Sequence, residues 1–115
     1  MKRFGASNIF LLGDDIEWEE LGGGIKRKIM AYDDRIMLVN VHFEAGGVGT
    51  LHSHYHSQVT YVASGEFEFT VDNEVKLVKE GDALYIPPNA MHGTICKKSG
   101  VLIDVFSPIR EDFMQ

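Results

Sequence analysis

The chain has 115 residues, 44% of them hydrophobic, and carries a formal net charge of −6 at pH 7. A chain of this length buries a core without disulfides, so its lone Cys96 needs no partner and fits a reducing cytoplasm better than a secreted setting. The acidic balance, without a cluster of Lys or Arg, argues against nucleic acid as a partner, because phosphate binding depends on concentrated positive charge.

The first feature along the chain is a short apolar run, Ile-Phe-Leu-Leu, at residues 9–12. This run is too short for the core of a secretory signal or for a membrane span. We therefore predict a β-strand here, in a cytoplasmic protein that does not bind membranes. Such a strand can pair with its copy in a second subunit or be exchanged for it.

Short alternating or β-branched runs then recur at intervals of about eight to twelve residues, which is the spacing of an all-β sandwich or barrel. Gly, Asp, Asn and Pro residues separate the runs and predict turns, including one at Ser99 and Gly100. No long stretch has a helical period, so we expect at most a helical turn near residues 110–114. The predicted strands cover residues 24–31, 35–44, 58–62, 66–71, 75–78, 83–86, 93–97 and 101–106.

Alternation within a strand assigns its side chains to two faces. In residues 66–71, Phe67 and Phe69 share one face and polar side chains occupy the other, which is typical of a half-buried strand. In residues 101–106, Asp104 shares its face with Leu102 and Phe106. Asp104 is therefore expected to be a carboxylate with apolar neighbours.

Three of the five histidines belong to the string His-Ser-His-Tyr-His at residues 52–56. In a strand, His52 and His54 point to the same face about 6.6 Å apart, which is close enough to converge on one metal ion. Gln58 can join them only if the chain turns after His54 and a new strand begins at Gln58. Such a turn leaves His56 near the rim.

The fourth ligand must come from a distant part of the sequence. His92 is the natural choice, because the rigid Pro-Pro-Asn corner at residues 87–89 precedes it and aims it. We therefore predict one divalent metal ion bound by His52, His54, Gln58 and His92. The fifth histidine, His42, lies on an alternating strand, where it is either a satisfied polar residue or a substrate contact.

The spacing of these residues resembles the two sequence motifs of the cupin superfamily. In the first motif, intervals of five, one, three and six residues separate Gly46, His52, His54, Gln58 and Gly65. In the second, Gly81 is followed after five residues by Pro87, and His92 stands five positions later. The resemblance implies a single cupin domain over residues 1–115, with a double-stranded β-helix, or jelly-roll barrel, at about residues 35–107. It also implies a homodimer, because cupins of this size are commonly dimers.

Three positions depart from the cupin pattern: Gln58 replaces Glu, Asn89 replaces Gly and Cys96 replaces Asn. A neutral Gln58 leaves the full charge on a divalent ion, which favours a Lewis acid that binds anions over a redox centre. Asn89 tolerates the left-handed turn that Gly would occupy, and Cys96 is expected to be a small buried side chain. Three imidazoles and an amide oxygen suit nickel, zinc, iron, manganese or cobalt.

Further stretches, at residues 17–28, 52–61 and 102–113, are similar to the KdgF-type pectin-degradation proteins, a cupin family that acts on unsaturated uronates. The most specific of them is the string Asp-Val-Phe-Ser-Pro-Ile-Arg-Glu-Asp-Phe at residues 104–113. The resemblance implies a metal-dependent, non-redox enzyme of the isomerase type. Its substrates would be 4,5-unsaturated uronate monosaccharides from pectin or alginate, and its products linear 4-deoxy-5-keto hexuronates.

Within that activity, the metal and Arg110 are assigned to the sugar carboxylate, Asp104 to general acid or base catalysis, and Phe106 to packing against the ring. Apolar neighbours raise the pKa of Asp104, whereas a nearby metal lowers it. A structural interpretation is open for each residue. Arg110 can pair with Glu111 or Asp112, Asp104 can bind a backbone amide, and Phe106 can belong to the core. A sugar-acid sensor without catalysis, a three-histidine dioxygenase and another sugar isomerase are the alternative functions.

Overall fold

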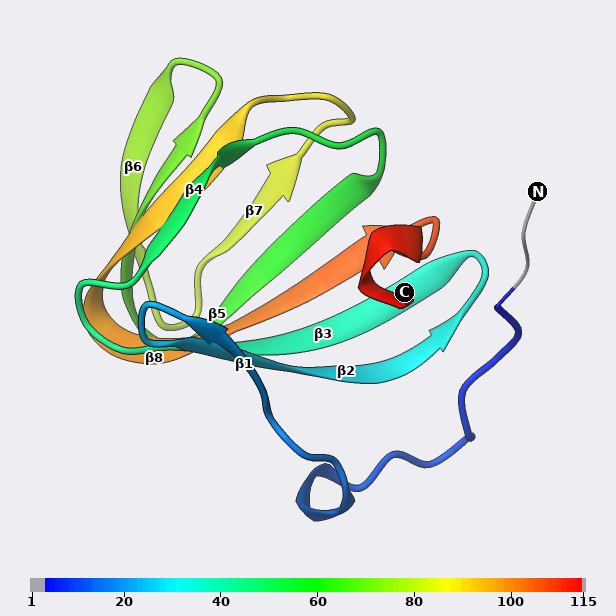
Figure 1. Ribbon diagram of the computed structural model, residues 1–115. Helices are drawn as coiled ribbons and strands as arrows, with labels where there is room; N and C mark the ends of the chain where they lie inside the picture. Colours follow the sequence, from blue (N-terminus) through cyan, green and yellow to red (C-terminus); the bar gives the residue numbers. More distant parts are fainter. Residues whose placement is uncertain (1–3, 115) are drawn as a thin grey trace.

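The computed structural model describes residues 4–114 and folds them into a β-barrel of antiparallel strands (Figure 1). Among these residues the helices are two short 3-10 segments, η1 (Gly13–Asp15) and η2 (Glu111–Met114), and the second confirms the predicted helical turn. No helix in this part of the chain has the length and apolar character that crossing a membrane requires. The strands are β1 (Glu19–Gly22), β2 (Ile25–Asp33), β3 (Ile36–Phe43), β4 (Val48–His52), β5 (Ser57–Val71), β6 (Glu74–Lys79), β7 (Ala83–Ile86) and β8 (His92–Ser107).

The two long strands, β5 and β8, belong to both layers of the barrel. The first part of β5 pairs with β7 and with the end of β8, and its second part pairs with β6 and with the start of β8. β3 extends the layer at the end of β8, and β4 pairs with the start of β8. β1 and β2 continue the sheet beyond β3. The result is the predicted all-β jelly roll, with its cavity between the layers.

Two glycines let the long strands bend where they pass from one layer to the other. A Cβ atom on Gly100 would lie 2.1 Å from the carbonyl oxygen of Ser64, and one on Gly65 would lie 2.5 Å from that of Lys98. Gly65 also has a φ of +85°. The turn predicted at residues 99–100 is therefore wrong: β8 continues through it, because glycines allow two backbones to touch at a bend.

The core lies on the inner faces of the strands, as the alternation predicts. Phe67, Phe69, Leu102 and Phe106 are buried, and so is the thiol of Cys96. β3 alternates along its length, with buried side chains at Met37, Val39, Val41 and Phe43. Because these side chains point inward from both layers, polar residues that share their faces must also point into the barrel.

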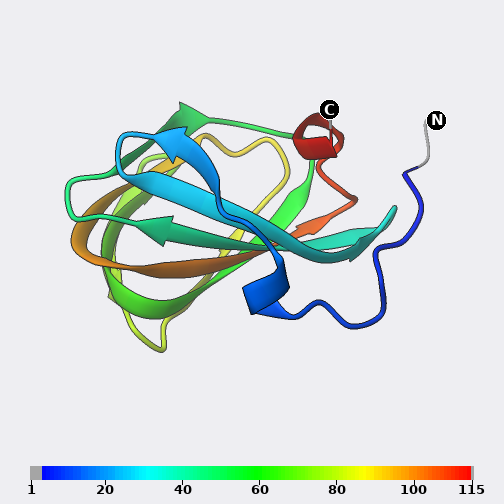
Figure 2. The ribbon, with the colours of Figure 1, turned by 60° about the horizontal axis from the view of Figure 1, so that its bottom comes forward.

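The strand predicted at residues 9–12 does not form. The segment before β1 runs outside the barrel (Figures 1 and 2), and Ile9 and Phe10 have exposed fractions of 90% and 84%. β1 pairs with the start of β2, at Ile25 to Arg27, and farther along β2 the N–H of Ser7 donates to the carbonyl oxygen of Tyr32 over 2.8 Å. The contact of the segment with β2 therefore falls at Ser7, and among residues 4–114 the run at residues 9–12 has no partner strand. An apolar run with strand propensity stays irregular without such a partner.

Candidate functional site

The cross-strand register of β4 and β8 brings the two motifs together. His52, the last residue of β4, lies directly opposite His92, the first residue of β8. His54 follows in the loop after β4, and Gln58 is the second residue of β5, where the sequence predicts that a new strand begins. The Pro-Pro-Asn corner is also tied to this loop, because the N–H of Asn89 donates to the carbonyl oxygen of His54 over 2.8 Å. Asn89 adopts the expected left-handed conformation, with a φ of 67°.

The three histidines are oriented alike by the backbone. Each faces a carbonyl oxygen with its Nδ1 atom, at 2.9 Å for His52, 3.2 Å for His54 and 2.9 Å for His92. Since Nδ1 donates the proton in each ring, Nε2 carries the free lone pair. One potential ligand atom from each of the three side chains lies within 4.8 Å of the others. This cluster is compatible with a divalent metal ion.

Two local features of the cluster fit a bound cation. Nε2 of His92 is buried and has no hydrogen-bond partner among residues 4–114. Nε2 of His54 lies 3.0 Å from Oε1 of Gln58, and because Nδ1 of His54 carries the proton, two lone pairs face each other. A positive ion between them would satisfy both, whereas a buried acceptor without a partner costs free energy.

Protonation does not supply that positive charge near neutral pH. Burial, followed by the positive charge of Arg110, lowers the pKa of His54 to about 4. Burial also lowers the pKa of His92, more than its backbone hydrogen bond raises it. Both imidazoles are therefore neutral at pH 7, which is the form that binds metals.

Asp104 lies on β8 opposite Thr60 of β5 and accepts a hydrogen bond of 2.7 Å from the Thr60 hydroxyl. The amide nitrogen of Gln58 donates to the same Thr60 oxygen over 2.9 Å and is 3.4 Å from Asp104. Burial raises the pKa of Asp104 to about 6, although hydrogen bonds from Thr60 and Gln58 and the charge of Arg110 lower it. The apolar surroundings expected from the alternation are present, and the carboxyl group can change its protonation state near neutral pH.

Arg110 is buried beside the site, and the pairing with Asp112 that the sequence left open is present. Its Nε and Nη2 atoms donate to the Asp112 carboxylate over 3.0 and 2.8 Å. Its guanidinium also lines the cavity and lies 5.0 Å from the ring centre of Phe106. An arginine has five N–H donors, so the pair with Asp112 leaves donors available for a ligand.

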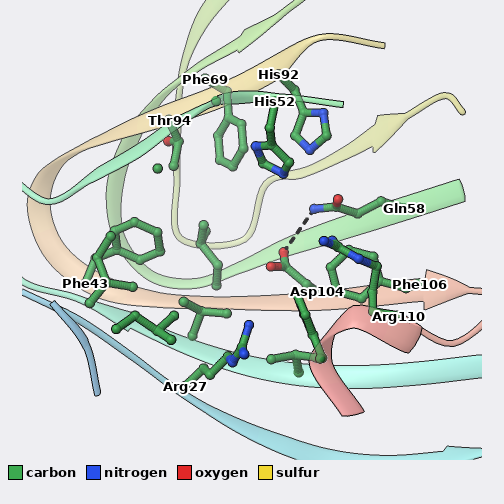
Figure 3. Close-up of a pocket in the computed structure, with 18 residues that line it drawn as sticks. Arg27, Phe43, His52, Gln58, Phe69, His92, Thr94, Asp104, Phe106 and Arg110 are labelled. Atoms are coloured by element: carbon green, nitrogen blue, oxygen red, sulfur yellow. Dashed lines mark hydrogen bonds between the residues drawn. The ribbon is translucent and has the colours of Figure 1, made fainter. Parts of the chain in front are cut away.

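These side chains surround a cavity of about 240 Å³ that opens between the layers (Figure 3). His52, Gln58 and His92 line one side of it, and Asp104 lies at its centre. Apolar core residues such as Phe43 and Leu102 form the remaining wall. A small polar ligand that enters would meet convergent polar groups on an apolar background, which is typical of a binding site.

Sequence reasoning missed three residues of this site: Thr60, Arg27 and Phe113. Thr60 had a signal, because it follows Gln58 by two positions and therefore shares its face of the strand. Arg27 and Phe113 line the cavity from β2 and η2, and only the fold places these elements beside the motifs.

His56 does not lie near the rim as predicted. Its side chain is buried, and Nε2 lies 2.7 Å from Oε1 of Glu111 and 3.1 Å from the carbonyl oxygen of Ile109. Tyr55 donates its hydroxyl proton to the same Glu111 carboxylate. The prediction failed because the chain after β8 returns over this loop and covers His56, which ties η2 to the loop that carries His54.

His42 points away from the cavity. It shares β3 with Val41 and Phe43, whose side chains face the core, and its own side chain faces outward. There its ring lies 6.2 Å from that of Trp18. Of the two interpretations of His42, a substrate contact inside the cavity is therefore wrong.

Comparison with known proteins agrees with this geometry. Residues 39–106 match the cupin domain family. The chain is a cupin. It is 48% identical over 107 residues to the pectin degradation protein KdgF of Dickeya dadantii, and the matched region covers 91% of this cupin and 97% of the relative. This identity places the chain in the KdgF group of cupins.

Two solved structures are similar over nearly their whole length. The crystal structure of an RmlC-like cupin from Shewanella frigidimarina superposes on this cupin with a TM-score of 0.93 at 43% identity, over 96% of this chain and 99% of the other. The structure of KdgF from a Halomonas species has a TM-score of 0.89 at 37% identity, over 93% and 99%. The double-stranded β-helix expected from the motifs is therefore confirmed.

Proposed function

We propose that this cupin is a metal-dependent enzyme that converts 4,5-unsaturated uronate monosaccharides into linear 4-deoxy-5-keto hexuronates. The observation that carries the proposal is Asp104, a carboxyl group with a pKa of about 6, in one cavity with the His52, His92 and Gln58 side chains. The similarity of this cupin to the pectin degradation protein KdgF of Dickeya dadantii supports this choice of substrate class.

The reaction needs one net proton transfer and no electron acceptor. The anomeric hydroxyl loses its proton, the carbonyl at C1 forms, and the bond between C1 and the ring oxygen breaks. The ring oxygen becomes the keto oxygen at C5 while C4 gains a proton in place of the double bond. Substrate and product are isomers, so a group that can both give and take a proton near neutral pH suffices for the acid and base steps.

Each proposed residue performs one of these tasks. Asp104 transfers the proton to C4 in its acid form and recovers a proton as a base. Thr60 donates a hydrogen bond to the Asp104 carboxylate and holds it in place. Arg110 binds the sugar carboxylate with the donors that Asp112 leaves available, and Phe106 packs against the sugar ring.

The proposed metal ligands are His52, His54, Gln58 and His92. A divalent ion bound there supplies a Lewis acid that binds and polarises the sugar carboxylate. Gln58 fits this role, because its amide oxygen faces His54 while its amide nitrogen faces Thr60 and Asp104. The same amide thus connects the ligand cluster to the acid, and being neutral it leaves the charge of the ion uncompensated.

The decisive experiment follows unsaturated galacturonate, prepared with a pectate lyase, by its near-ultraviolet absorbance. We expect the absorbance to fall without oxygen uptake at an oxygen electrode, and Asp104→Asn to bind metal but lose turnover. Oxygen consumption coupled to turnover would establish the dioxygenase alternative instead. Binding without any loss of absorbance would favour the sensor, and full activity of Asp104→Asn would remove Asp104 from the mechanism.

We propose further that the protein acts as a cytoplasmic homodimer, and that the apolar segment at residues 9–12 contributes to the dimer interface. Ile9, Phe10 and Leu12 have exposed fractions of 90%, 84% and 64%, and a second subunit would bury this surface. Light scattering on the wild type and on Phe10→Asp tests this. A monomeric wild type would refute the dimer, and a dimeric Phe10→Asp with unchanged affinity would exclude the segment from the interface.

A further inference from the structure

Arg27 is a second cationic group in the cavity, separate from Arg110. It lies on β2 opposite Val41 of β3, and Val41 belongs to the buried core. Its side chain is only 14% exposed and lines the same cavity as Asp104. Figure 3 shows its guanidinium reaching toward Asp104 from the side facing away from His52 and His92. An arginine on an apolar inner face is costly unless its charge is compensated.

Glu19 of β1 supplies that compensation from the outside. Nε and Nη2 of Arg27 donate to the two Glu19 carboxylate oxygens over 3.0 and 3.1 Å. The Glu19 side chain is 53% exposed, so this ion pair stands at the mouth of the cavity. Two of the five N–H donors of Arg27 are used, and no other acceptor for this guanidinium occurs among residues 4–114. Three donors are therefore available to a molecule in the cavity.

The ring of Phe113 contacts both Arg27 and Arg110. The guanidinium carbon of Arg27 lies 4.0 Å from the ring centre of Phe113, and that of Arg110 lies 4.2 Å from it. Each guanidinium is paired with its own carboxylate, Glu19 or Asp112, and both are attracted to the aromatic ring. The cavity thus contains two preorganised arginines, only one of which the proposed mechanism uses.

We propose that Arg27 is a specificity-determining residue that binds the hydroxyl oxygens of the sugar acid at the end away from its carboxylate. This inference rests on the proposed function, which assigns the carboxylate to Arg110 and the histidine cluster. A ring held there extends across Asp104, and Arg27 is the cationic donor on the opposite side. A planar guanidinium with three remaining N–H groups fits two neighbouring oxygens of a sugar.

The competing explanation is that Arg27 only pins β1 to β2 through Glu19, and two variants separate the two roles. Arg27→Met removes the donors but keeps an apolar stem against Phe113. Glu19→Gln weakens the ion pair but leaves the guanidinium in place. We expect Arg27→Met to raise KM for unsaturated galacturonate about tenfold or more, because a hydrogen bond to a charged donor is lost, with a much smaller change in kcat. Glu19→Gln should not raise KM.

Two controls define this measurement. Arg35→Met removes one positive charge from an exposed residue outside the cavity and should leave KM unchanged, which tests for a general effect of charge. Arg27→Lys keeps the charge but not the planar fork, and its KM should fall between those of the wild type and Arg27→Met. Thermal unfolding of each variant identifies losses that come from misfolding.

The outcomes also separate this inference from the proposed function. If the wild type turns over the substrate, two results would refute the role of Arg27 while the proposed function stands. One is a wild-type KM for Arg27→Met, and the other is a KM for Glu19→Gln that is raised as much as that of Arg27→Met. If the wild type does not turn over, calorimetric binding of D-galacturonate replaces KM. Loss of that binding in Arg27→Met but not in Glu19→Gln supports the inference without the reaction, and equal binding by all three proteins refutes it.

Discussion

Replacing Asp104 with Asn should stabilise the metal-free protein at neutral pH, although we assign this residue to catalysis. The pKa of Asp104 is raised from 3.8, its ordinary value, to about 6 in the fold, chiefly by burial. Because the folded pKa is the higher one, this group favours folding most below pH 3.8, and that contribution disappears as the pH rises through 6. A difference of about 2.2 between the two pKa values corresponds to about 3 kcal/mol in the free energy of unfolding.

The assay is urea denaturation of EDTA-treated wild type and Asp104→Asn between pH 4.5 and pH 8. Asn keeps the shape of the side chain and the acceptor for Thr60 but has no charge to bury. The free energy of unfolding of the variant minus that of the wild type should therefore grow by about 2 kcal/mol across this range, because part of the full difference is already lost by pH 4.5, while contributions from other titrating groups cancel. A difference that does not change with pH would refute the raised pKa and the reasoning that Asp104 is a proton donor near neutrality.

Three further predictions concern the metal cluster, the bend of the barrel and the contact between η2 and the His54 loop. Adding zinc or nickel to EDTA-treated protein should stabilise it by about 2.7 kcal/mol at a hundredfold excess over Kd, and thermal unfolding should show that His92→Ala abolishes this effect. Gly100→Ala should give little folded protein, because its Cβ would lie 2.1 Å from a carbonyl oxygen. Gly81 has open space around it, so Gly81→Ala should lower the free energy of unfolding by only about 1–2 kcal/mol, for its positive φ. Circular dichroism and urea denaturation compare the two variants. Glu111→Ala removes the acceptor shared by Tyr55 and His56, so it should raise KM by loosening Arg110 while metal content, measured by mass spectrometry, stays the same.

The proximity of His52, His54 and Gln58 could be predicted from sequence because it is largely local, whereas His92 joins them through the pairing of β4 with β8 and is predicted from the motif spacing. His52 and His54 are two positions apart, Gln58 begins the next strand, and a rigid corner precedes His92. The apolar neighbours of Asp104 are likewise encoded by alternation within one strand. In these cases a short stretch of sequence determines which way the side chain points.

The rest depends on contacts between distant segments. The position of Arg27 in the cavity follows from the pairing of β2 with β3, and nothing near Arg27 in the sequence indicates it. His56 is buried only because the chain after β8 passes over it. Gly100 has the composition of a turn, but the backbone of Ser64 lies against it and the strand continues. Local propensity cannot distinguish a turn from a bend that a neighbouring strand imposes.

The division of the cavity between long strands and the chain that follows β8 has a consequence for how this protein can evolve. His92 and Asp104 belong to β8 and Gln58 to β5, so two of the four proposed ligands and the proton donor are built into the two strands that hold both layers together. Arg110 and Phe113 lie beyond β8, where insertions and substitutions do not break the sheet. Mutations there can change substrate preference while the proposed ligands and proton donor stay in place. Related proteins can therefore evolve toward different substrates of the same reaction.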